Sequence, residues 1–124
     1  MPLPPLRVAF PKAMASSGYD PARIQWDWQY IFLENVFSPL VEIDPAGQIK
    51  SGVAVRFEWV GDAARFEMRS ELKTADGRRI KAEDAAVSLK RLLILTGNTH
   101  GNLKSLLCPD SDLKSLSDEC PGIA

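Results

Sequence analysis

The stretch from Asp76 to Arg91 constrains the fold more than any other part of the sequence. It opens with Asp76-Gly77, a pair typical of tight turns because glycine tolerates a positive φ. Apolar side chains then recur at helical spacing and predict a helix over 82–93 with one buried stripe. The members of this stripe are Ala85, Ala86, Leu89, Leu92 and Leu93. Glu83 and Asp84 at its start, and Lys90 and Arg91 toward its end, have the signs that complement the helix macrodipole.

A second strong pattern is the alternation over residues 53–60. Apolar side chains occupy every second position, and this period of two predicts a half-buried strand. The apolar set is Val53, Val55, Phe57 and Trp59. Gly61-Asp62 predicts a turn, and residues 65–68 predict the returning strand, with Phe66 and Met68 on one face. The two strands form a predicted antiparallel hairpin.

Weaker signals surround these two features. Residues 6–10 predict a first strand that Pro11 closes, 41–43 predict another strand, and 44–47 predict a turn. Asp27 is expected to cap a helix with an apolar stripe of Tyr30, Leu33, Phe37 and Leu40. Residues 97–102 are predicted to be loop, and 103–107 and 113–116 to be short helical pieces. The predicted fold is α+β, with a small antiparallel sheet built from hairpins and two main helices.

Composition excludes several functional classes. The 124 residues suit one domain, and 15 basic against 16 acidic residues leave no positive field for nucleic acid. No apolar run approaches the roughly 20 residues of a membrane span. The first residues, Met1-Pro2-Leu3-Pro4-Pro5, do not have the pattern of a signal peptide. We therefore expect either a cytoplasmic protein or one whose signal was removed and replaced by a methionine.

The residue types needed for catalysis are scarce. There is one histidine, His100, and neither a serine elbow nor a phosphate-binding glycine loop, so a non-enzymatic role without cofactor or metal is expected. Cys108 and Cys120 either form a disulfide or are free thiols, and the sequence leaves both alternatives open. A thiol enzyme that pairs Cys108 with His100 is a weaker hypothesis.

Several blocks of the sequence resemble one family in the same order. The matching blocks are Tyr19-Asp20-Pro21, Asn35 to Val41, Asp44 to Gly47, Ser51 to Phe57, Phe66 to Arg69 and Asp76 to Arg91. This order resembles the N-terminal lobe of family 5 extracellular solute-binding proteins, the oligopeptide, dipeptide and nickel receptors of ABC importers. The chain departs from the pattern in three places. Phe57 replaces a tryptophan, the hairpin is shorter, and Lys81 stands where a threonine would cap the helix.

The resemblance implies a structure and a function. Residues 1–124 would be an incomplete N-terminal lobe, part of lobe I of a two-lobed fold, with a first strand at 6–10 and a small subdomain over about 20–124. The chain would be the substrate-binding component of an importer for peptides or related small solutes, in the periplasm or attached outside the cell. Its partners would be the solute, the membrane permease and the remaining lobes of the receptor. The alternative is an isolated structural or interaction subdomain that binds no ligand.

Two loops are the candidates for ligand contact. One follows the first strand and contains Ser16, Ser17 and Tyr19, and the other contains His100 and Asn102. Ordinary surface loops are the competing interpretation of both segments. No residue is predicted to be catalytic or to bind a metal.

Overall fold

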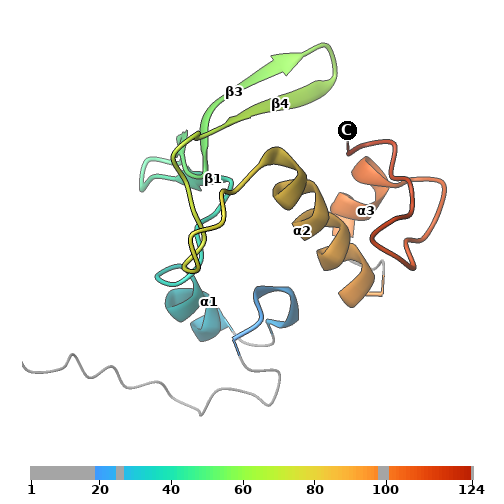
Figure 1. Cartoon of the computed structure of the whole chain (residues 1–124). Helices are drawn as coiled ribbons and strands as arrows, with labels where there is room; N and C mark the ends of the chain where they lie inside the picture. Colours follow the sequence, from blue (N-terminus) through green and yellow to red (C-terminus); the bar gives the residue numbers. More distant parts are fainter. Residues whose placement is uncertain (1–18, 25–26, 98–100, 124) are drawn as a thin grey trace, which may run out of the picture.

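The computed structural model describes residues 19–24, 27–97 and 101–123, and in these ranges the chain is α+β, as predicted. Its elements, in order, are η1 (Pro21–Arg23), α1 (Asp27–Leu33), β1 (Val41–Ile43), β2 (Ile49–Ser51), β3 (Ala54–Val60), β4 (Ala63–Met68), α2 (Ala82–Leu95) and α3 (Gly101–Leu107) (Figure 1). The described strands form two separate two-stranded antiparallel sheets, where the sequence predicted one. The strand predicted at 6–10 lies outside the described residues. None of the described helices combines the length and apolarity needed to cross a bilayer.

Helix α1 is shorter than predicted, and the expected apolar stripe is wrong. The helix ends at Leu33, where the Asn35 side chain donates to the carbonyl of Ile31 at 2.7 Å and satisfies a group that the helix end leaves free. Leu33 is buried, but Tyr30 is 51% exposed and Phe37 is 44% exposed. The spacing of the apolar residues therefore predicted a longer amphipathic helix than the chain forms.

The first hairpin, β1–β2, depends on one carboxylate. Asp44 Oδ1 accepts from the main-chain N–H groups of Ala46 and Gln48, each at 2.9 Å. Gly47 completes the turn with a φ of 78°, a conformation that glycine adopts without a steric penalty. The strand over 41–43 and its turn are confirmed, whereas β2 was not predicted because its three exposed residues show no apolar alternation.

The second hairpin, β3–β4, is confirmed, but its predicted burial is not. Ala54 at its base is buried, and the register shifts between Ala54 and Arg56. Farther out, Val55 is 43% exposed and Trp59 is 72% exposed. Figure 1 shows the hairpin extending away from the helices. No other described strand pairs with this hairpin. The alternation of apolar residues therefore predicted the strand correctly, but it did not predict whether the apolar face would be buried.

Gly52 joins the two hairpins through a close approach of main chains. A Cβ atom at this position would lie 2.9 Å from the Leu40 carbonyl oxygen and nearer still to that of Pro39. Next to it, Val53 N–H donates to the Pro39 oxygen at 2.9 Å. Arg69 Nε donates to the Gly52 carbonyl, also at 2.9 Å. The residue at position 52 must therefore be glycine for these segments to meet.

Helix α2 leads into a small core at the C-terminal end of the described chain. Leu93 is fully buried against Cys108, Leu113 and Cys120, and the two cysteines form a disulfide. Leu93 is the only member of the predicted α2 stripe that is fully buried, since the other four are half-buried. Of the two alternatives for the cysteines, the structure thus has the disulfide and not the free thiols.

The segment after α3 is not helical where a helix was predicted. Over 113–116, Asp118 Oδ2 accepts from the main-chain N–H groups of Lys114 and Ser115 at 2.8 and 2.9 Å and holds a turn. Such side-chain bonds compete with a helical ladder. The piece predicted over 103–107 is confirmed as the greater part of α3.

Candidate ligand-facing site

Of the five predicted ligand-contacting residues, two lie in the described part of the chain. Tyr19 is 57% exposed, and its ring centroid lies 5.0 Å from that of Phe32 on α1. Ser16, Ser17 and His100 fall outside the described residues.

Asn102 is the second described candidate, and its predicted loop setting is wrong. It lies in the first turn of α3, exposed, and its carbonyl oxygen accepts from Ser105 Oγ at 2.9 Å. No described hydrogen bond or ring contact joins it to Tyr19. The structure therefore keeps Tyr19 as an exposed aromatic candidate and does not bring Asn102 to it.

An ion pair fixes the main chain next to Tyr19. Asp20 Oδ1 accepts from Arg91 Nη1 at 2.9 Å, and Asp20 Oδ2 accepts from Arg91 Nη2 at 2.6 Å. Asp20 also caps η1 by accepting from Ala22 N–H at 3.0 Å. Both terminal nitrogens of Arg91 are used, so this is a two-point contact with defined orientation. It holds η1 against α2 and sets the position from which Tyr19 projects.

The Arg91 contact also sets the charge state of Asp20. The Arg91 guanidinium lowers the pKa of Asp20 to about 2, chiefly by its hydrogen bonds and with a smaller contribution from Ala22 N–H. The pKa of Arg91 is raised by the same contact. Both groups are therefore charged throughout the physiological range. Sequence reasoning missed this pair because its members are 71 positions apart and no local pattern links them.

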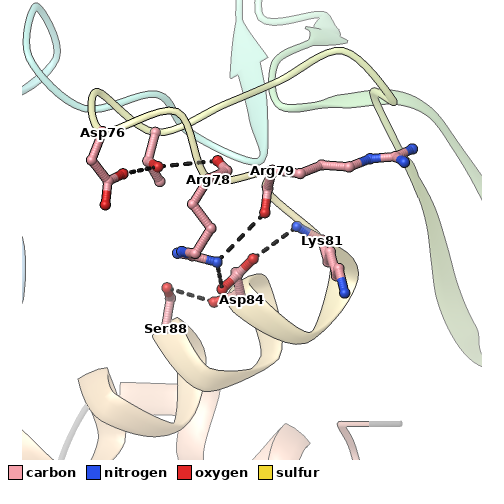
Figure 2. A network of polar contacts seen from close by, with 7 residues as sticks. Asp76, Arg78, Arg79, Lys81, Asp84 and Ser88 are labelled. Atoms are coloured by element: carbon pink, nitrogen blue, oxygen red, sulfur yellow. Dashed lines mark hydrogen bonds and ion pairs between the residues drawn. The ribbon is translucent and has the colours of Figure 1, made fainter.

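The start of α2 is organised by Asp84, as Figure 2 shows. Asp84 Oδ2 accepts from Lys81 N–H at 2.8 Å, and Asp84 Oδ1 accepts from Arg78 Nη1 at 2.9 Å. The Lys81 ammonium has no lone pair with which to cap the helix, so only the reciprocal half of a capping box forms. The Lys81 N–H bond, followed by the Arg78 contact, lowers the pKa of Asp84. The Asp84 carboxylate and the Arg78 guanidinium are thus paired within the segment, and their role there is structural.

The turn before this helix is also closed by its own side chains. The Thr74 hydroxyl bonds the carboxylate of Asp76 and also lies 3.0 Å from the Arg78 carbonyl oxygen (Figure 2). The Thr74 bond lowers the pKa of Asp76. Gly77 has a φ of 86°, as the turn requires. The side chains that close this turn and begin α2 are therefore engaged in shaping the chain.

A shallow hollow lies on the β3–β4 hairpin. Its volume is about 180 Å³, below the roughly 300 Å³ at which small-molecule pockets begin. The lining residues are Arg56, Phe57, Glu58, Arg65, Phe66 and Glu67. The four charged members are already paired across the strands, as Arg56 with Glu67 and Arg65 with Glu58. The hollow is thus not a built ligand site.

The described residues contain no cluster of three or more metal-ligating side chains. Cys108 is fully buried and bonded to Cys120, so it has no thiol to act as a nucleophile. This removes the thiol-enzyme hypothesis that paired Cys108 with His100.

Comparison with known proteins gives no relative. No family model, no curated protein and no solved structure matches this chain.

Proposed function

We propose that this chain is the N-terminal part of the substrate-binding component of an ABC importer, and that it captures peptides or related small solutes outside the cytoplasm. The observation that carries the proposal is the contact between Asp20 and Arg91. Asp20 belongs to the first block of the family resemblance and Arg91 to the last. A two-point ion pair between them supports the view that the blocks form one unit.

The contacts around Gly52 support the same view. Gly52 lies in the block from Ser51 to Phe57, its carbonyl accepts from Arg69 in the returning-strand block, and its neighbour Val53 bonds Pro39 in an earlier block. Residues that carry the resemblance therefore contact one another.

The disulfide supports an extracytoplasmic location. Disulfides persist in oxidising compartments and are rare where thiols are kept reduced. Cys108 and Cys120 close a short loop around Leu93, and the bond is part of the core. A periplasmic or cell-surface protein can keep such a core.

In the proposed mechanism, solute binds without covalent chemistry between this lobe and a second one. Tyr19 offers an exposed ring that can pack on a peptide side chain, and the Asp20–Arg91 pair holds its main chain in place. Closure of the lobes would bury the solute, and the membrane permease would then receive it.

Calorimetry tests this proposal. A pool of short peptides is titrated into the protein, expressed with whatever its gene encodes beyond Ala124, and saturable heat is expected. Tyr19→Ala should weaken binding by about threefold to tenfold, because an aromatic contact is lost. Tyr30→Ala is the matched control, since Tyr30 is a similarly exposed tyrosine on α1, and it should bind as the wild type does. The absence of saturable heat with peptides and with nickel would contradict the proposal.

A further inference from the structure

The β3–β4 hairpin pairs two copies of the same tripeptide. Arg-Phe-Glu occurs at 56–58 on β3 and again at 65–67 on β4. The register places Arg56 opposite Glu67, Phe57 opposite Phe66 and Glu58 opposite Arg65. The two rings lie 6.4 Å apart, and Arg56 Nη2 lies 2.8 Å from Glu67 Oε2. An Arg-Phe-Glu strand is therefore complementary to itself when it runs antiparallel.

The outer edge of β3 has the same tripeptide at its centre. Among the described residues, β3 has no strand neighbour other than β4. In a ladder closed by a two-residue turn, the pair beside the turn exchanges main-chain hydrogen bonds, and every second pair does so. Counting from Val60 and Ala63, the N–H and C=O groups of Phe57 are expected to face away from β4. An edge of this kind is a template for another strand.

Several apolar side chains along this edge are exposed to solvent. Val55 is 43% exposed, Trp59 is 72% exposed and Val60 is 55% exposed. At the base of the strand, Ala54 N–H already donates to the Leu40 carbonyl at 3.0 Å, and the Val55 carbonyl accepts from Ser51 Oγ at 2.9 Å. The register also shifts at residue 55, so regular pairing would begin at Arg56. Residues 56–59 thus form a short, self-complementary edge, with the exposed Val55 and Trp59 side chains at its two ends.

We propose that β3 pairs with β3 of a second copy of this chain, antiparallel, about a twofold axis at Phe57. In this register Arg56 faces Glu58 of the second copy, and Trp59 lies beside its Val55, where the strand is irregular. The symmetry makes each of these pairs occur twice, and the product is a four-stranded sheet in the order β4-β3-β3-β4. The corresponding register on β4 would set only Ala64 against Met68, so β3 buries more apolar surface. The assembly goes beyond solute capture and does not depend on it.

Charge swaps within the hairpin test the register. Arg56→Glu combined with Glu67→Arg keeps the intramolecular pair with its polarity reversed, but it places Glu against Glu58 of the second copy at two sites. Sedimentation of the full chain over a concentration series should then show a dimer dissociation constant that is raised about tenfold or more. Adding Glu58→Arg and Arg65→Glu restores opposite charges everywhere, so the fourfold variant should recover wild-type affinity. Circular dichroism verifies the folding of each variant.

Cross-linking identifies the edge that pairs. Cys108 and Cys120 are bonded to each other, so among the described residues only an introduced cysteine would offer a free thiol to the cross-linker. With a short bismaleimide, Phe57→Cys should cross-link efficiently. Phe66→Cys should not, because its two copies would lie about 14 Å apart, three strand spacings across the sheet. A wild type that stays monomeric at every concentration, a double swap that dimerises as tightly as the wild type, or cross-linking through position 66 alone would overturn the proposal.

Discussion

At the scale of single residues, Asp20 makes stability depend on pH in a defined direction. Its pKa of about 2 in the folded chain lies below the ordinary value of 3.8, so its contribution is complete above that value and is lost as pH falls toward 2. Because Arg91 is 45% exposed and solvent screens the pair, we expect the contribution to be about 1 kcal/mol. Urea unfolding of the wild type and of Asp20→Asn should therefore converge between about pH 4 and pH 2.

The comparison with Asp20→Asn isolates this residue from the other acids. The pKa values of Asp76, Asp84 and Asp118 are lowered too, so all three contribute to acid lability in the same direction. Equal stability of the wild type and Asp20→Asn at pH 7 would show that the Arg91 contact contributes nothing.

Gly52 is the second residue whose effect should be large. Gly52→Ala places a methyl group against the carbonyl oxygens of Pro39 and Leu40, which are main-chain atoms and cannot rotate away. We expect a loss of about 1–3 kcal/mol in the free energy of unfolding, measured by urea titration. Ser51→Ala next to it removes only the exposed hydrogen bond from Ser51 Oγ to the Val55 carbonyl and should cost less than about 1 kcal/mol. Similar values for the two variants would contradict the close approach.

At the scale of elements, the disulfide is the main constraint on the end of the chain. It links Cys108 after α3 to Cys120, and the loop between them packs Leu113 on Leu93. Replacing both cysteines by alanine should lower the free energy of unfolding by about 3 kcal/mol, as the chain-entropy model gives for a loop of this length. The wild type with reductant should behave in the same way. A double variant as stable as the oxidised protein would contradict this account.

The elements that the sequence predicted well are those with local causes. Helix α2 has its capping carboxylate and stripe within one segment, and the β1–β2 turn is made by Asp44 alone. Burial was predicted poorly, because it depends on what packs against an element. The Phe37 and Trp59 side chains had the right spacing but no described element to cover them fully.

The candidate site was predicted less well than the fold for the same reason. Tyr19 was predicted to lie in the loop that follows the first strand, but the ion pair that positions its neighbour joins residues 71 apart. Asn102 was misplaced because α3 begins earlier than its apolar residues indicate. A single sequence does not predict contacts between distant residues, and it does not predict helix ends that lack a local capping signal.

At the scale of the whole molecule, the described chain leaves several large apolar side chains uncovered. Ile31 is 61% exposed, Ile43 is 73% exposed and Leu106 is 73% exposed, on three different elements. Exposed apolar surface of this kind is where further protein packs. It supports the proposal that this chain is one part of a larger, two-lobed receptor.

Small-angle X-ray scattering of the complete gene product, with and without a saturating pool of short peptides, tests solute capture between two lobes most directly. Closure of the lobes on solute should lower the radius of gyration on saturation, and the change should reverse when the peptide is dialysed away. A scattering profile that does not change at saturating peptide would contradict the account.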